Sequence, residues 1–374
     1  MTRLPKTAVA SLRIVLACCI SAAAVAASPP LVTTTGKLVE SSGGARYEQM
    51  ANKSASLLEG QDRSGLTTHL QQLKTDPGLS EPAREKLLRE TVLGLAAIEP
   101  TPQLKAAVGS LSGYQIETWL LTREHGHPEP YPAYDVAAAA RFVERRWQET
   151  AARKTAAAAL EQGDIVAIDA YIGGSEAVRR GFEEAFSAAG PARLAAFSEV
   201  LADRLESGQP VAGLAVAAAL ASQDGRLWQT VVREAPPKAA TRAVAEFDPA
   251  VWGGQAVALL AGATLRDETA SAAMLRLAPL AGSDPAARHL LFDAIGGPHG
   301  TSAAAALARG ADARIVDQLA ALLDQADDPI SRRRALLALR LAGDGRAEDH
   351  LAAFARRPDA PADLIAEVPS WLRD

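Results

Sequence analysis

The chain has 374 residues, with 39 basic and 44 acidic side chains, a formal net charge of −5 at pH 7 and 48% hydrophobic residues. Alanine and leucine, which both have high helix propensity, account for 81 and 45 residues. Aromatic residues make up only 5%, and β-branched runs bounded by turn residues are scarce, which argues against a sheet sandwich or an alternating β-α-β protein. The composition therefore predicts an all-helical protein, long enough to bury a large core.

The first 27 residues have the order of a secretory signal peptide. A basic leader ends at Arg13, an apolar stretch follows, and the small residues at positions 25–27 suit cleavage. The apolar stretch is shorter than the roughly 20 residues that span a bilayer. We therefore expect residues 1–27 to be removed, which leaves a mature chain that begins at Ser28, has no membrane span and is periplasmic or secreted.

Lipoprotein processing at Cys18 is the alternative, and it would anchor the mature protein to a membrane through a lipid. Cys18 and Cys19 are the two cysteines of the chain. Cleavage after residue 27 would remove both, which excludes disulfides and cysteine-ligated metals from the mature protein. The three basic residues of the leader would be lost as well, so the mature chain would be more acidic than the precursor.

Helical apolar spacing begins at Ala45 and continues almost to the end of the chain. Residues 28–44 lack this spacing and are rich in Pro, Thr, Ser and Gly, which predicts a flexible lead-in. A loop over 124–134 separates an N-terminal helical block, 45–123, from a C-terminal helical repeat block, 135–374. The predicted helices span 45–59, 63–74, 80–97, 102–110, 114–123, 135–161, 163–171, 174–188, 190–206, 209–222, 225–234, 236–246, 249–263, 267–281, 285–295, 301–310, 313–325, 329–342, 345–356 and 360–368.

A helix-start motif repeats within the C-terminal block. The sequence Asp-Pro-Ala-Ala-Arg at 284–288 returns 44 residues later as Asp-Pro-Ile-Ser-Arg at 328–332, and the apolar positions of the two helices return with it. The helices that follow match at an offset of 32, which predicts 12 extra residues in the first unit, near 297–310. Asp suits the N-cap and Pro the first helical turn.

This pattern resembles the HEAT-like helical repeats, including the short class named after phycobilisome lyases, most clearly over 284–357. The resemblance implies stacked helical hairpins that form an α-solenoid, or HEAT-like superhelix. It also implies a structural ladder role for four residues: Asp284, Arg288, Asp328 and Arg332. HEAT-like repeats occur in lyases and DNA glycosylases, but no site residue of either can be placed in this chain, so the resemblance implies only a fold.

The least helical segment of the mature chain contains four candidate partner-binding residues: His125, His127, Tyr131 and Tyr134. Proline at every second position opposes a helix and favours extended, polyproline-like backbone. One interpretation is a binding loop, and another is a weak metal site with a nearby carboxylate, although a His-x-His pair supplies only two ligands. The third is an exposed connector that the tyrosines pack down. We assign no metal, cofactor or catalytic residue.

Two other segments have ordinary explanations. The Gly-rich turn at 296–302 precedes a helix, but no Lys follows at the spacing of a nucleotide-binding loop. The arginines at 332–334 are balanced within their segment, because 328–374 contains eight basic and eight acidic residues. Nucleic-acid binding is therefore not predicted.

We expect a non-catalytic helical-repeat scaffold or binding protein of the bacterial envelope, with a protein or peptidoglycan partner. The alternative is a hydrolase or lyase that acts on envelope polymers through carboxylates in a helical groove. A groove with two converging acids would favour the enzyme, and a groove lined by apolar and singly charged residues would favour the scaffold.

Overall fold

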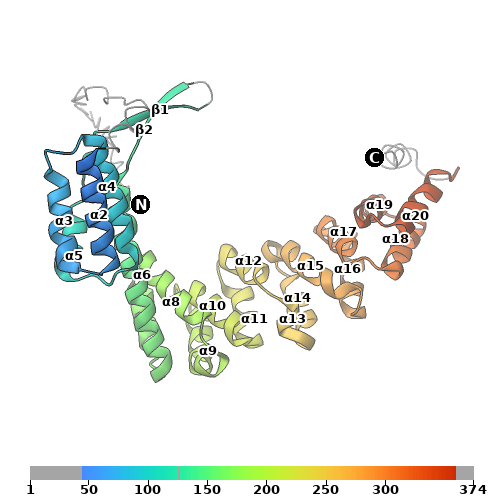
Figure 1. Ribbon diagram of the computed structural model, residues 1–374. Helices are drawn as coiled ribbons and strands as arrows, with labels where there is room; N and C mark the ends of the chain where they lie inside the picture. Colours follow the sequence, from blue (N-terminus) through green and yellow to red (C-terminus); the bar gives the residue numbers. More distant parts are fainter. Residues whose placement is uncertain (1–43, 125–126, 359–374) are drawn as a thin grey trace, which may run out of the picture. The chain divides into compact units, whose positions relative to one another are not determined.

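The computed structural model describes residues 44–124 and 127–358 (Figure 1). The expected signal peptide, the lead-in before Gly44, Cys18 and His125 lie outside these residues. Apart from one hairpin, the described chain is helical, which confirms the all-α prediction. The chain divides into two compact units, Met1–Glu144 and Arg145–Asp374, and the boundary falls within α6 (Val136–Gln162). No helix in the described ranges is long and apolar enough to cross a membrane.

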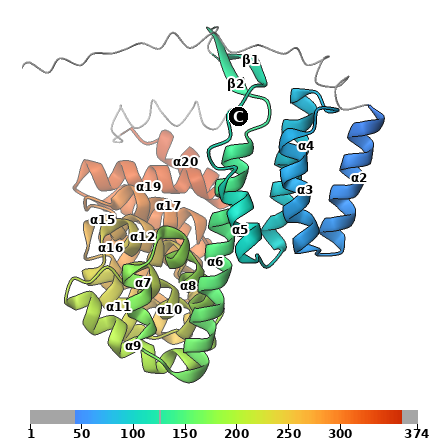
Figure 2. The same cartoon turned by 90° about the vertical axis from the view of Figure 1, so that its left-hand side faces the viewer.

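The first unit is built on three helices that pack side by side, α2 (Ala45–Glu59), α3 (Arg63–Thr75) and α4 (Glu81–Gly94) (Figure 2). The 3-10 turn η1 (Leu95–Ala97) and α5 (Pro102–Gly109) follow, and α5 packs against α3. Leucines at helical spacing form the core because they share the inner faces of these helices. The buried leucines include Leu66, Leu70, Leu73, Leu87 and Leu88.

A small polar cluster lies inside this core. His69 is fully buried, and its Nε2 lies 2.8 Å from Oγ of Ser54. Thr91 donates its hydroxyl hydrogen to Oγ of Ser54 at 2.9 Å, so the cluster joins α2, α3 and α4. Burial lowers the pKa of His69, with the nearby charge of Lys53 as a second cause. Burial therefore favours the neutral form of the imidazole.

Strands β1 (Trp119–Glu124) and β2 (His127–Pro132) form an antiparallel hairpin. The predicted helix over 114–123 is wrong, and seven residues of the predicted loop over 124–134 lie in strands, Glu124 in β1 and the six residues of β2. The pattern of prolines explains β2: residues two apart in a strand turn their N–H positions to the same side. Ala133 donates its N–H to Thr118 O at 2.9 Å, so residues of β2 an even number away from Ala133 turn their N–H groups towards β1. The prolines at 128, 130 and 132 are an odd number away, so their nitrogen atoms face the outer edge of the hairpin, where no ladder hydrogen bond is lost.

Glu85 of α4 fastens the base of this hairpin. Its side chain is fully buried, and its carboxylate accepts the backbone N–H of Glu117 at 2.7 Å and of Thr118 at 3.2 Å. Burial raises the pKa of Glu85, against the effect of these hydrogen bonds. A long-range contact of this kind leaves no periodic trace in the sequence, which is why 114–118 could not be placed from pattern alone.

The second unit is a stack of helices in two layers (Figure 1). Layer A contains α8 (Glu176–Ser187), α10 (Ala212–Ser222), α12 (Pro237–Ala245), α15 (Asp267–Ala281), α17 (Gly300–Arg309) and α19 (Pro329–Ala342). Layer B contains α9 (Pro191–Glu206), α11 (Gly225–Glu234), α14 (Ala256–Ala263), α16 (Pro285–Ala294), α18 (Ala313–Gln325) and α20 (Gly345–Ala355). The short elements α7 (Ala167–Gly173), α13 (Pro249–Trp252) and η2 (Gly253–Gln255) complete the unit.

Small residues let these helices approach closely. A Cβ on Gly310 would lie 2.1 Å from Ala278 O, and a Cβ on Gly181 would lie 2.3 Å from Glu149 O, so both contacts need glycine. Larger gaps are filled by aromatic rings, as where Phe247 and Trp252 stack at 4.9 Å between centroids. Trp228 packs against both and is buried.

The sequence repeat at an offset of 44 does not match the structural repeat. It equates α16 with α19, but α16 lies in layer B and α19 in layer A. The extra segment expected near 297–310 is α17, an ordinary helix of layer A. The offset of 32 is consistent with the layers, because α18 and α20 both belong to layer B. An Asp-Pro pair marks a helix start by local chemistry, and that chemistry is the same in either layer.

Candidate binding groove between α16 and α18

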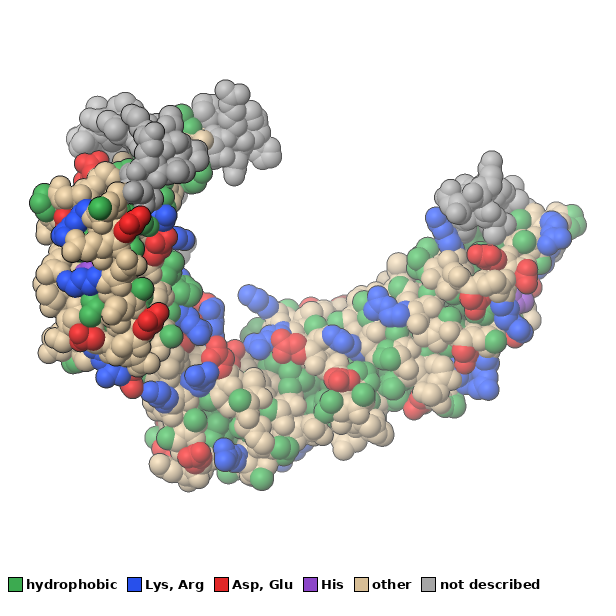
Figure 3. All heavy atoms as spheres, in the orientation of Figure 1, with side chains coloured by type: hydrophobic (Ala, Val, Ile, Leu, Met, Phe, Trp, Pro, Cys, Tyr) green, Lys and Arg blue, Asp and Glu red, His purple; other side chains and the backbone are tan. Residues whose placement is uncertain are grey.

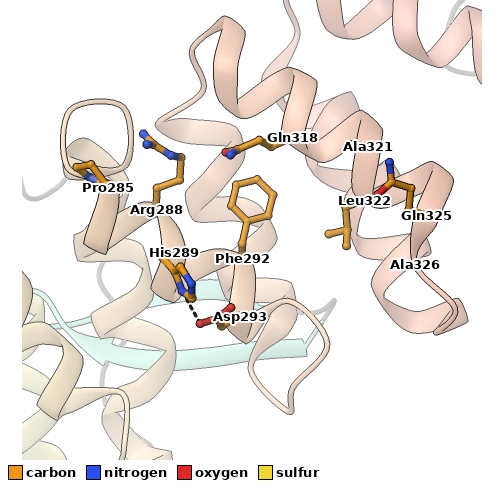
Figure 4. A pocket seen from close by; sticks show the side chains of 10 residues that line it. All are labelled: Pro285, Arg288, His289, Phe292, Asp293, Gln318, Ala321, Leu322, Gln325 and Ala326. Atoms are coloured by element: carbon orange, nitrogen blue, oxygen red, sulfur yellow. Dashed lines mark ion pairs between the residues drawn. The ribbon is translucent and has the colours of Figure 1, made fainter.

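A groove of about 600 Å³ lies between α16 and α18 of layer B (Figure 4). This volume is within the range of sites that hold a small ligand or a few residues of a peptide. The lining residues are Pro285, Arg288, His289, Phe292, Asp293, Gln318, Ala321, Leu322, Gln325 and Ala326.

The middle of the groove is apolar. Phe292 of α16 and Leu322 of α18 are half-buried, and Ala321 and Ala326 add small side chains beside them. The equivalent of Phe292 in the sequence repeat, Leu336, is fully buried. Phe292 keeps an exposed part because neighbouring layer B helices leave a gap here, and Figure 4 shows its ring reaching into that gap.

Two amide side chains line the α18 side. Gln318 and Gln325 are both exposed and are seven residues apart, which is two helical turns and about 10.5 Å along the axis. Residues at this spacing share one face of a helix. Each amide offers two donors and one acceptor oxygen, so the pair is suited to hydrogen bonding with the backbone of another chain.

The charged groups lie on the α16 side. Nδ1 of His289 is 2.6 Å from Oδ2 of Asp293 one turn later, and both side chains are largely exposed. Buried Arg288 donates from Nη1 to Ala281 O at 3.1 Å, which ties its guanidinium to the end of α15. Asp293 is the one carboxylate among the lining residues. The groove therefore combines an apolar centre, two amides and a mixed-charge edge.

A similar depression of about 640 Å³ lies between α11 and α14, the two layer B helices that precede α16 in the chain. Gln229 again supplies an amide beside an apolar surface, here formed by Trp228, Leu259 and Leu265. The Nε1 of Trp228 is buried and has no hydrogen-bond partner among the described residues. Gaps between successive layer B helices are thus a recurring feature of the second unit.

A third depression, of about 460 Å³, lies on α6, α8 and α12 and contains two adjacent carboxylates, Glu183 and Glu184. Glu183 accepts hydrogen bonds from the Tyr171 hydroxyl at 2.9 Å and from Arg242 Nη1 at 3.2 Å. Burial, followed by the charge of Glu183, raises the pKa of Tyr171 well above its ordinary value. Glu183 therefore ties together three helices, and its oxygens are already occupied.

His127, Tyr131 and Tyr134 of the predicted binding loop belong to the first unit, and His125 lies outside the described residues. His127 lies in β2, opposite Glu124 in the register. Tyr131 is 43% exposed, whereas Tyr134 is partly buried, and burial raises its pKa. Nearby, Lys86 Nζ lies 5.4 Å from the centroid of the Tyr47 ring. Among the residues that the structure describes, no group of three or more His, Cys, Asp or Glu side chains could hold a metal ion.

Both ladder aspartates cap helices. Asp284 accepts the N–H groups of Ala286 and Ala287 at 2.7 and 3.2 Å. Asp328 accepts those of Ile330 and Ser331 at 3.0 and 2.9 Å. Hydrogen bonding to Ser331, first through its hydroxyl group, lowers the pKa of Asp328.

The ladder arginines do not pair with these acids. Arg288 donates to the end of the preceding helix, and the structure shows no ion pair between Arg332 and Asp328, both of which it describes. Arg334, two residues further on, donates from Nη1 to Ile295 O at 2.7 Å and to Gly297 O at 2.6 Å. A guanidinium is drawn to helix ends because the last carbonyl groups lack partners.

Sequence reasoning did not find the groove. It singled out Arg288 for a different role and passed over Phe292, Gln318, Leu322 and Gln325. The spacing of the two glutamines is the one signal in the sequence, and it is weak because exposed glutamines are common on helices. The gap itself depends on how two helices pack, which only the tertiary structure specifies.

No family model and no curated protein matches this chain.

Proposed function

We propose that this protein is a non-catalytic binding protein that holds an extended segment of another protein in the groove between α16 and α18. The observation that carries this proposal is the pairing of Phe292 and Leu322 with the two exposed amides, Gln318 and Gln325. An apolar side chain of the partner would pack between Phe292 and Leu322. Its backbone would hydrogen-bond to the amides, a combination that is typical of peptide recognition.

The rival proposal is an envelope-polymer hydrolase or lyase that uses carboxylates in a helical groove. Hydrolysis of a glycosidic bond usually needs two facing carboxyl groups. The groove supplies one, Asp293, beside His289, and the second acid would have to come from elsewhere. This favours the scaffold over the enzyme.

We further propose that the protein acts in the bacterial envelope, as a periplasmic or secreted HEAT-like repeat protein with a protein or peptidoglycan partner. The support is the signal-peptide pattern of residues 1–27 and the stacked helices. Mass spectrometry of the exported protein tests the location. We expect a chain that begins at Ser28. A lipid on an N-terminal Cys18 would contradict this and show that the protein is anchored to a membrane.

Peptide selection tests the groove. Short random peptides selected on the mature protein should bind less tightly to Phe292→Ser, by about 1–3 kcal/mol for one lost apolar contact. Gln318→Ala should weaken binding without removing the preference for an apolar anchor. The matched control is Val251→Ser, because Val251 is an exposed apolar residue of α13 outside the groove.

Circular dichroism of each variant separates lost binding from lost folding. Equal weakening by Phe292→Ser and Val251→Ser would place the binding site elsewhere. Cleavage of purified peptidoglycan by the wild type would contradict the non-catalytic assignment and support the rival.

A further inference from the structure

The two layers of the second unit differ in charge. From α12 onward, the layer A helices α12, α15, α17 and α19 contain eight Lys or Arg residues and two acidic residues. The layer B helices contain five Lys or Arg residues and six acidic residues, counted over α11, α14, α16, α18 and α20. The whole chain is acidic, so an excess of positive charge on one layer is a property of the fold.

Helical spacing turns several of these basic residues away from layer B. In α12 the buried residues are Ala240, Ala243 and Val244, so exposed Lys238 and Arg242 lie on the opposite side. Arg309 is exposed at the end of α17. In α19 the same reasoning places Arg333 and Arg340, which are both exposed, seven residues apart on one outer face. Figure 3 shows Lys and Arg side chains recurring along the side of this unit where Figure 1 places α12, α15 and α17.

We call the outer surface of α12, α15, α17 and α19 the basic face. Arg242 on this face is already paired with Glu183 at 3.2 Å and with Glu246 at 2.8 Å. The two acidic residues, Asp267 and Glu268, are both in the first turn of α15. Glu268 lies 3.2 Å from Nε of Arg266, which precedes the helix. Across the described ranges, Lys238, Arg276 and Arg309 form no ion pair. Their charges are therefore available to a partner.

We propose that the basic face binds an acidic, extended segment of a partner protein. Charge complementarity is the argument, since a row of guanidinium groups recognises carboxylates through paired hydrogen bonds. Neighbouring helices pack about 8–10 Å apart, which is close to the length of three extended residues. A carboxylate at every third residue of the partner would then meet one layer A helix after another.

The observations favour a protein over a nucleic acid. The four helices of the basic face contain no Phe, Tyr or Trp, so they lack the aromatic side chains on which proteins that bind single-stranded nucleic acids stack successive bases. The face lies on layer A and the groove between α16 and α18 lies on layer B, so the proposal extends the proposed function to a second partner segment and does not depend on it.

Fluorescence anisotropy with synthetic peptides tests the proposal on the full mature chain. A peptide with Glu at every third residue should bind at low salt and be released as salt rises. The double variant Lys238→Glu with Arg309→Glu should lower its affinity by about tenfold or more. The matched control is Arg226→Glu with Arg314→Glu, which makes the same change of charge at exposed positions of layer B.

Three results would overturn the proposal. One is the absence of binding at low salt, and another is an equal loss of affinity in the layer A and layer B variants. The third is tighter binding of a single-stranded oligonucleotide than of the acidic peptide. A peptide with the same number of glutamates in one block should bind less tightly than the spaced peptide. Circular dichroism checks that both double variants are folded.

Discussion

Arg334 of α19 donates from Nη1 to Ile295 O at 2.7 Å, thirty-nine residues earlier in the chain. The same nitrogen lies 2.6 Å from Gly297 O. Ile295 and Gly297 follow α16, so an arginine of one layer closes the carbonyl end of a helix in the other. Arg266 is used in the same way, since it donates to Val232 O at 2.6 Å and Ala235 O at 2.9 Å at the C-terminal end of α11.

Arg334→Ala should lower the free energy of unfolding by about 1–3 kcal/mol, because two carbonyl groups lose a charged donor. Arg332→Ala should cost less, since no hydrogen bond or ion pair of the Arg332 side chain is found in the described part of the chain. Thermal unfolding followed by circular dichroism compares the two variants of one helix. An equal loss from both would show that the carbonyl contacts of Arg334 contribute little.

Gly310→Ala should destabilise the second unit by about 1–3 kcal/mol, because the new Cβ would lie 2.1 Å from Ala278 O and the backbone would have to shift. Gly262→Ala is the control. A Cβ on Gly262 meets nothing within 4 Å, so alanine within α14 should stabilise by about 0.5–1 kcal/mol. The pair is measured by chemical denaturation, and a neutral Gly310→Ala would mean that α15 and α17 can separate without loss.

Glu85→Gln should weaken the hold on the hairpin, because a single amide oxygen replaces the carboxylate that accepts the Glu117 and Thr118 N–H groups. We expect a loss of about 1–3 kcal/mol at neutral pH, with Glu81→Gln, at an exposed position of the same helix, as the neutral control. Hydrogen exchange of the Glu117 and Thr118 amides reports the effect directly. Unchanged protection in Glu85→Gln would contradict the anchoring role.

The buried His69 should make stability depend on pH. Burial lowers its pKa in the folded protein below the ordinary 6.5, so its contribution is fully present above pH 6.5. As pH falls towards the folded-state pKa, the unfolded chain takes up a proton that the folded chain does not, and stability is lost. Melting temperatures between about pH 7.5 and pH 5.5 should therefore fall more for wild type than for His69→Gln. If the melting temperatures of wild type and His69→Gln fall equally with pH, His69 does not cause the pH dependence of stability.

The sequence predicted many helices well because their start signals are local. Asp284 and Asp328 cap the predicted helices at 285 and 329, and Asp312 and Asp344 do the same for the helices that follow them. An N-cap hydrogen bond joins residues two or three apart, so it can be read from neighbouring letters. The failure at 114–123 has the opposite cause, since β1 exists through its pairing with β2 and through Glu85, a residue of another helix.

By itself, the sequence determined that the chain is helical and where most helices begin, because propensity, capping and apolar spacing act within a few residues. Only the tertiary structure decided to which layer each helix belongs. Layer membership depends on contacts between helices about thirty residues apart, and the same Asp-Pro start serves both layers. It separates the basic side chains of α19 from the acidic ones of α20, although their shared segment is neutral. It also leaves Phe292 half-exposed in a groove while its counterpart Leu336 is buried.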